Sequence, residues 1–168
     1  GKRGKDSENK QPTLLILSTL EDNNYPQYVK LHTLPNYKGE PIEEYLKEKC
    51  LFDPTIVINS DRDKAFFCLN KLAQLENSVV DYTKENHKLK WLNTFTGNIQ
   101  SNINHLYRLV KKRDLPLFLS EQEWRINHRY SGKRIMDKVK KYISTSTPVT
   151  FKQITNSVLA YEKQFLSA

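Results

Sequence analysis

The strongest constraint on the fold is a continuous apolar segment at residues 13–20 of this 168-residue chain. Its run TLLILSTL contains Leu and β-branched residues, is too short for a buried helix, and is typical of a strand covered on both faces. Polar residues 21–24 then predict a turn, and the alternating segment 28–32 is typical of the returning strand of a hairpin. A chain that begins in this way is expected to build its core around a sheet.

Further helices and strands follow in alternation. Pro41 suits the first turn of a helix, where its missing N–H costs nothing, and Asp63 suits the N-cap of another. Residues 83–97 have a mixed pattern and are interpreted mostly as loop. The other predicted elements are strands at 55–59 and 78–82 and helices at 41–49, 63–75, 98–113, 116–132, 134–143 and 151–165. This order predicts an α/β fold with a mixed sheet.

The same order matches an RNase H-like core from which the first strand is missing. Such a core runs three antiparallel strands, then helix, strand, helix, strand and helix. Its metal-binding residues lie on the first strand, at the exit of the fourth strand and on the helix after the fifth. Asp61 and Asn98 fall on the second and third of these places.

Asp61 and Asn98 are therefore the candidate catalytic and metal-binding residues. Oxygen donors at a strand exit and at a later helix start can share Mg²⁺ ions, which lie roughly 3.5–4 Å apart in two-metal phosphoryl chemistry. Both residues also suit local roles, Asp61 in a turn and Asn98 as a helix N-cap after Gly97. The pattern alone leaves both interpretations open.

Positive charge is concentrated in one part of the chain. The net charge is +8, and residues 84–141 contain fourteen Lys and Arg against five Asp and Glu. This bias favours a polyanionic partner, above all nucleic acid, although lysine-rich helices also serve solubility. The candidate phosphate-binding residues are Lys111, Lys112, Arg113, Arg125 and Arg129. The two last arginines could equally pair with acids within the fold, since Arg125 stands four residues after Glu121.

The cysteines and the hydropathy indicate the cellular setting. Cys50 and Cys68 are isolated, without a CxxC motif, which indicates reduced thiols in a cytosolic protein. No apolar stretch approaches the ~20 residues that span a bilayer, so no membrane association is predicted. The chain begins at Gly1 without an initiator Met, and we expect it to be a fragment of a longer protein.

Several blocks of the chain carry a family pattern. Residues 89–100 read LKWLNTFTGNIQ, residues 118–129 read FLSEQEWRINHR, and residues 59–61 read NSD. These resemble the patterns LPWVHRVISNLK, YLDEFxFRFNRR and TDG of bacterial insertion-sequence transposases of the DDE type, in a branch whose third active-site residue is Asn. Residues 1–5 and 148–151 resemble two further family motifs. The resemblance covers nearly the whole chain.

The resemblance implies a partial RNase H-like catalytic domain at 1–131 and a C-terminal helical tail at 132–168. It implies that Asp61 and Asn98 hold Mg²⁺ or Mn²⁺, that the partner is DNA, bound by a possible homo-oligomer, and that the protein acts at the bacterial nucleoid in the cytoplasm. The chain also departs from the family. The first catalytic Asp is expected before Gly1, and a family Gly, His and Lys are replaced by Arg62, Asn93 and Gln100.

We therefore predict a truncated catalytic domain of a DNA transposase. The intact enzyme would cleave phosphodiesters at the ends of the element and transfer the freed 3′-hydroxyls to target DNA. Without the first Asp, we expect this chain by itself to bind metal poorly and to be inactive. The alternatives are a nonenzymatic DNA-binding protein that keeps the basic surface, and a decaying transposase remnant.

Overall fold

The structure, a computed structural model, describes residues 10–19, 25–50, 55–61, 63–77, 88–106, 110–130 and 132–156. The strands are β1 (Thr13–Thr19), β2 (Pro26–Thr33), β3 (Val57–Ser60) and β4 (Gln74–Asn77). The α-helices are α1 (Gly39–Lys49), α2 (Lys90–Ser101), α3 (Leu115–Asn127) and α4 (Lys133–Thr145). Shorter elements are the 3₁₀ helices η1 (Lys64–Lys71) and η3 (Lys112–Asp114) and the π-helical turn η2 (Asn102–Leu106). Residues 151–156 are also helical.

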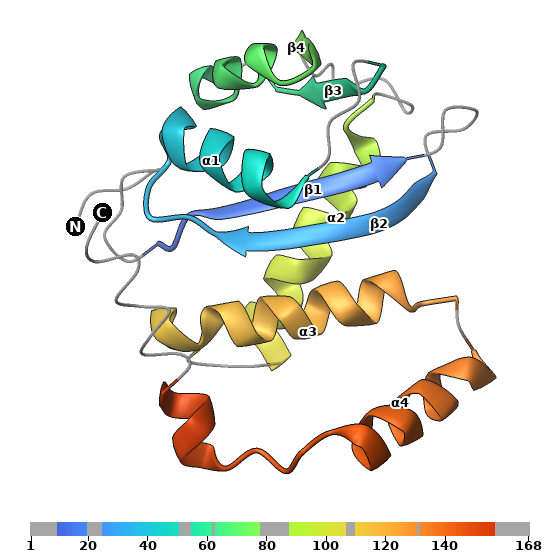
Figure 1. Ribbon diagram of the computed structural model, residues 1–168. Coiled ribbons are helices and arrows are strands. Elements are labelled where there is room, and N and C mark those ends of the chain that lie inside the picture. Colours follow the sequence, from blue (N-terminus) through green and yellow to red (C-terminus); the bar gives the residue numbers. More distant parts are fainter. Residues whose placement is uncertain are drawn as a thin grey trace.

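The predicted hairpin forms the central layer of the molecule. β1 and β2 pair antiparallel, from Thr13 opposite Thr33 to Leu17 opposite Val29. α1 lies on one face of the hairpin, while α2 and α3 lie on the other (Figure 1). The helices thus cover both faces of β1, whereas Tyr28 and Lys30 of β2 stay exposed.

This double coverage explains the continuous apolar run that the sequence places in β1. Successive side chains of a strand point to opposite faces. Leu14 and Ile16 accordingly pack with α1, whereas Leu15 and Leu17 pack with the cluster that α2 and α3 complete. Each face needs its own apolar residues, so the run shows no polar alternation.

The hydrophobic core has two parts, one on each side of the hairpin. The first contains Leu14, Leu34, Ile42, Tyr45, Leu46 and Leu69. The second contains Val29, Leu31, Ile99 and Leu119. In the first part, α1 begins in close contact with η1: a Cβ at Gly39 would lie 2.9 Å from the backbone oxygen of Ala65 and 3.2 Å from Cys68 Sγ. A side chain there would force the two elements apart.

A second small sheet is formed by β3 and β4, which pair in parallel from Val57 opposite Gln74 to Ser60 opposite Asn77. The mixed α/β architecture is therefore confirmed. The structure differs from the expected continuous sheet, because the strands that it describes form two separate pairs, β1–β2 and β3–β4. No described strand connects β1 to β3.

Two predicted boundaries around η1 were wrong. The α-helix predicted at 63–75 is a 3₁₀ helix that ends at Lys71, and β4 already begins at Gln74. Asp63 does cap η1, since its Oδ1 accepts a hydrogen bond from Ala65 N at 3.1 Å. The strand predicted at 78–82 lies outside the described residues.

The loop predicted at 83–97 was wrong from residue 90 onward, because α2 begins at Lys90. Residues 83–87 lie outside the described part of the chain. The helical signal was present in the spacing of Leu89, Phe95 and Ile99, of which Leu89 and Ile99 are buried. Gly97 obscured this signal, although it faces open space inside the helix. A glycine in an exposed helix interior weakens the helix by about 1 kcal/mol without ending it.

The C-terminal half is mostly helical, as predicted, but the single helix expected at 98–113 was wrong, because α2 and η2 cover only residues up to Leu106 and residues 110–111 are not helical. α3 starts at Leu115 with Pro116 in its first turn, but it ends at Asn127 rather than at residue 132. Gly132, with a φ of 46°, then separates α3 from α4. Within the described ranges, we find no helix both long and apolar enough to cross a membrane.

Candidate active site

Asp61 lies directly after β3 and is exposed. Its Oδ1 accepts a hydrogen bond from Asp63 N at 3.2 Å, and Ser60 Oγ donates to the Asp61 backbone oxygen at 3.0 Å. The turn role that the sequence suggested is therefore present. Among the described residues, Oδ2 of Asp61 accepts no hydrogen bond, so the turn leaves one carboxylate oxygen for a ligand.

Asn98 lies inside α2 rather than at its start, so its interpretation as an N-cap was wrong. The side chain is exposed, whereas the next residue, Ile99, is buried against the hairpin. Four residues later, Asn102 Nδ2 donates to Gln122 Oε1 at 3.0 Å and ties the end of α2 to α3. Asn98 is thus presented on a helix that Ile99 and Asn102, which follow it, hold against the hairpin and α3.

These two residues supply hard oxygen donors, the chemistry that Mg²⁺ and Mn²⁺ prefer. No hydrogen bond joins Asp61 to Asn98, and within the described part of the chain no group of three or more His, Cys, Asp or Glu could hold a metal ion. A metal centre built on this pair needs a further ligand. The assignment of both residues remains a prediction.

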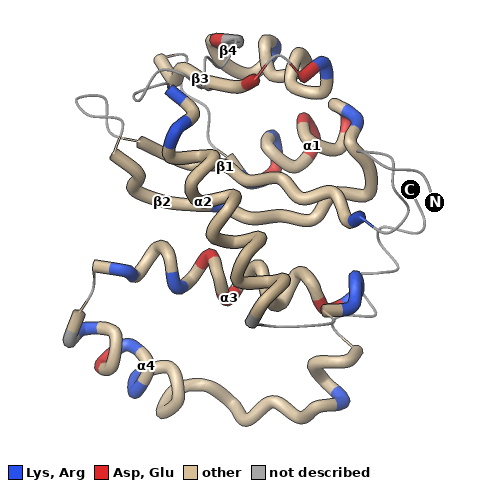
Figure 2. The backbone as a smooth tube through the Cα atoms, turned by 180° about the vertical axis from the view of Figure 1, so that it is seen from behind, with Lys and Arg blue, Asp and Glu red and all other residues tan. Residues whose placement is uncertain are grey.

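Three predicted phosphate contacts lie together before α3. Lys111, Lys112 and Arg113 are all exposed, and Arg113 Nε lies 3.3 Å from Asp114 Oδ1. Figure 2 shows Lys and Arg at this corner and again along α4. Exposed cations attract a nucleic-acid backbone without reading its sequence.

The two arginines of α3 have different environments. Arg125 is exposed and forms the expected ion pair with Glu121, at 2.8 Å. Arg129 instead turns toward the hairpin, where it donates to the backbone oxygens of Gln27, at 3.3 Å, and Pro26. The alternative that sequence analysis left open, a contact inside the fold, is therefore realised for Arg129, with carbonyl oxygens in place of acids.

Two further α3 residues, missed by the sequence analysis, bind the same strand. Asn127 Oδ1 accepts from Val29 N at 2.7 Å while its Nδ2 donates to Val29 O at 2.9 Å. Glu123 accepts from Leu31 N at 3.0 Å and from Lys30 Nζ at 2.8 Å. We call Glu123, Asn127 and Arg129 the β2-edge clamp. The available signal was the four-residue spacing of Glu123 and Asn127, which places both on one face of α3.

An aromatic group surrounds Arg129 at the end of the hairpin. Tyr25 contacts Trp91 edge to face, with ring centroids 5.6 Å apart, and its hydroxyl is hydrogen-bonded to that of Tyr130. The Arg129 guanidinium lies 4.5 Å from the centroid of the Tyr130 ring and 5.7 Å from that of Phe95. The hydrogen bond to Tyr25, followed by the Arg129 side chain, lowers the pKa of Tyr130.

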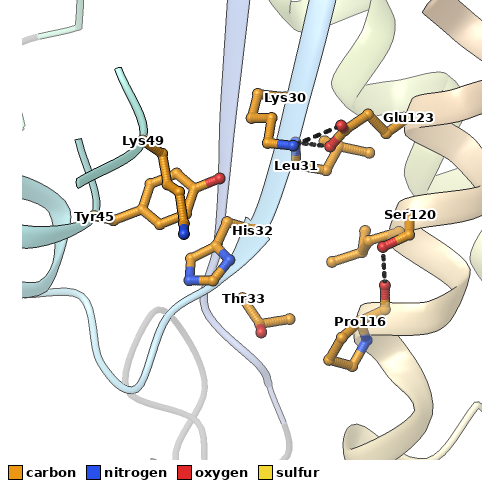
Figure 3. Close-up of a pocket in the computed structure, with 10 residues that line it drawn as sticks. Lys30, Leu31, His32, Thr33, Tyr45, Lys49, Pro116, Ser120 and Glu123 are labelled. Carbon is orange, nitrogen blue, oxygen red and sulfur yellow. Dashed lines mark hydrogen bonds and ion pairs between the residues drawn. The ribbon is translucent and has the colours of Figure 1, made fainter. Parts of the chain in front are cut away.

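A cavity of about 250 Å³ opens between β2, α1 and the start of α3 (Figure 3). His32 and Tyr45 stack at its wall, with ring centroids 3.9 Å apart. Burial, followed by the charge of Lys30, lowers the pKa of His32. The nearby carboxylate of Glu123 is already committed to Lys30 and to the backbone of β2. The cavity therefore combines a histidine of lowered pKa with a carboxylate that is already paired with Lys30.

Comparison with known proteins gives one match. The family model of the ISXO2-like transposase domain matches residues 1–127. No curated protein and no solved structure matches the chain. The matched segment includes Asp61, Asn98 and all of α3 up to Asn127, and it leaves out α4.

Proposed function

This chain belongs to the ISXO2-like transposase domain family, and on that premise we propose that it is part of the catalytic domain that cuts and joins DNA during transposition. The observation that carries the proposal is the position of Asp61. It stands exposed at the carboxyl end of β3, in a parallel pair of strands. Ligands of open α/β sheets bind at the carboxyl ends of their strands.

The proposed metal site uses the free oxygen of Asp61 together with the amide oxygen of Asn98. Bound Mg²⁺ or Mn²⁺ would activate the attacking oxygen and stabilise the leaving oxygen of the phosphodiester. Asp63 supports the site, because its backbone N–H fixes the orientation of Asp61 and its side chain caps η1. Asn98 adds no negative charge, so the site depends on a further carboxylate.

We further propose that the fold is RNase H-like. The further carboxylate would come from a strand that lies between β1 and β3 in the sheet and pairs with both. Two observations support this arrangement: each described sheet contains two strands, and both sheets pack against the cluster around α1. A strand in that place would join the pairs into one mixed sheet. It would also end beside Asp61 if it ran parallel to β3.

The DNA backbone is proposed to lie along Lys111, Lys112 and Arg113. These side chains are exposed just before α3. Arg125 makes a weaker candidate, since Glu121 competes for its guanidinium. Arg129 contributes by holding α3 on the hairpin rather than by a direct phosphate contact.

Paramagnetic Mn²⁺ tests the metal site even where binding is weak. In NMR spectra of the full chain, added Mn²⁺ should broaden the amide signals of Asp61 and Asn98 first, and Asp61→Asn should abolish this selectivity. Asp137→Asn, on α4, is the matched control and should leave the pattern unchanged. Broadening centred away from both residues, or retained in Asp61→Asn, would contradict the assignment.

A second candidate function is nonenzymatic DNA binding through the basic residues. The net charge of +8 and the exposed cations of α4 favour it. It predicts binding that weakens steeply with salt but is indifferent to EDTA and to Asp61→Ala. DNA cleavage that requires both Mn²⁺ and Asp61, in a protein that contains the completing strand, would exclude it.

A further inference from the structure

The aromatic group around Arg129 leaves much of its ring surface exposed to solvent. Tyr130 is 70% exposed and Tyr25 is 39% exposed. They come from different parts of the chain, Tyr25 just before β2 and Tyr130 just after α3. Exposed apolar side chains that form one patch rimmed by polar groups often mark a binding site, whereas single scattered ones do not.

Arg129 makes this surface electropositive. The guanidinium donates to three backbone oxygens, those of Pro26, Gln27 and Ile126. Within the described residues, no carboxylate forms an ion pair with it. Its full positive charge therefore lies under the Tyr130 ring, held in position by neutral partners. A ring backed by a fixed cation suits a planar, electron-rich group attached to an anion.

The group also lies close to the proposed metal site along α2. Phe95 contacts the Arg129 guanidinium and precedes Asn98 by three residues. Residues three apart are neighbours on a helix surface. A nucleotide stacked on Tyr130 would thus stand within reach of DNA bound at Asn98.

We propose that Tyr130 and Tyr25, backed by Arg129, form a stacking platform for an unpaired nucleobase of the DNA. Base faces are covered inside a duplex and become available to aromatic side chains only when the base is unstacked. The platform therefore favours single-stranded over double-stranded DNA. The inference rests on the proposed function for its DNA substrate, and it adds the strand conformation that the site accepts.

The test is binding of a labelled single-stranded 12-mer and of the matching duplex to the full chain, followed by fluorescence anisotropy. EDTA is present throughout, so that metal binding does not enter. Tyr130→Ala should weaken single-strand binding roughly tenfold, the effect of losing one base–aromatic stack, and duplex binding less than twofold. Tyr130→Phe keeps the ring and should bind like the wild type. Tyr37→Ala removes a tyrosine about as exposed as Tyr25, at 41%, but outside the platform, and should change neither affinity.

Equal losses for both DNA forms in Tyr130→Ala, no loss at all, or an equal loss in Tyr130→Phe would each overturn the platform. A second readout does not depend on that variant. With Trp124→Phe, Trp91 is the remaining tryptophan, 5.6 Å from the Tyr25 ring. Its fluorescence should be quenched by the single strand and not by the duplex. If both binding tests give the expected results while Mn²⁺ does not broaden the Asp61 amide signal, the proposed cleavage function is wrong but the stacking platform is supported.

Discussion

The two edges of the β1–β2 hairpin end in different ways. Along β2, the β2-edge clamp binds the outward-facing backbone: Asn127 takes both polar groups of Val29, and Glu123 takes the N–H of Leu31. Along β1, the only strand neighbour among the described residues is β2 itself. Side chains close the edge of β2, whereas no described strand or side chain closes the edge of β1.

The difference indicates where the sheet ends and where it continues. An unpaired strand edge invites pairing with another strand, and proteins cover the edges that should stay single. The clamp therefore identifies β2 as a true edge of the sheet. Among the residues that the structure describes, no side chain closes the free edge of β1 in this way, which is consistent with the strand that we propose between β1 and β3 in the sheet.

The largest effect is expected from opening the closed edge. Asn127→Leu leaves the N–H and C=O of Val29 without partners in a partly buried place, which should lower the free energy of unfolding by about 2–4 kcal/mol. Chemical denaturation measures it. Arg125→Ala, on the same helix but in an exposed ion pair, should cost under about 0.5 kcal/mol. A loss of similar size in both variants would show that the edge is not specifically clamped.

A smaller loss is expected at the other end of the clamp. Glu123→Ala removes the acceptor of Leu31 N and should cost about 1–2 kcal/mol. Glu123→Gln keeps an oxygen for that N–H and loses only the charge facing Lys30, which is half exposed, so it should cost less than about 1 kcal/mol. If Gln proves as harmful as Ala, the ion pair rather than the edge bond stabilises this region.

Hydrogen exchange compares the two edges directly. Leu15 lies opposite Leu31. Because Leu31 N bonds outward to Glu123, the two residues form a non-hydrogen-bonded pair, and both of their N–H groups point away from the hairpin. The clamped Leu31 amide should exchange at least about tenfold more slowly than that of Leu15, since local opening controls the rate. Equal rates would remove the distinction between the edges.

The smallest effect concerns the face of β2 rather than its edge. Burial lowers the pKa of His32 in the folded chain, so the unfolded chain binds more protons just below the ordinary histidine value of about 6.5. Stability should therefore fall as pH drops through that value. His32→Phe should flatten this part of the curve of melting temperature against pH. A curve of unchanged slope would exclude His32 as the cause.

Much of the fold could be predicted from local pattern. The hairpin, α1, β3 and α4 lie within a few residues of their predicted positions, because periodicity and end signals are properties of neighbouring residues. The start of α2 was missed because Gly97 masked a helical spacing that burial of Leu89 and Ile99 makes evident. Asn98 was consequently placed at a helix start that lies eight residues earlier, at Lys90.

By itself, the sequence determined the order of the elements, the coverage of β1 on both faces, the basic character of the C-terminal half and the family blocks around Asp61 and Asn98. Only the tertiary structure decided which polar residues of α3 serve the fold. Asn127 and Val29 are 98 residues apart, and no local pattern specifies which distant backbone groups a side chain will satisfy. The same packing directed Arg129 away from solvent and under the ring of Tyr130. The backbone N–H and C=O groups at the edge of β2 lack partners only once the strand has formed. The side chains of α3 that reach them acquire their structural role at that stage.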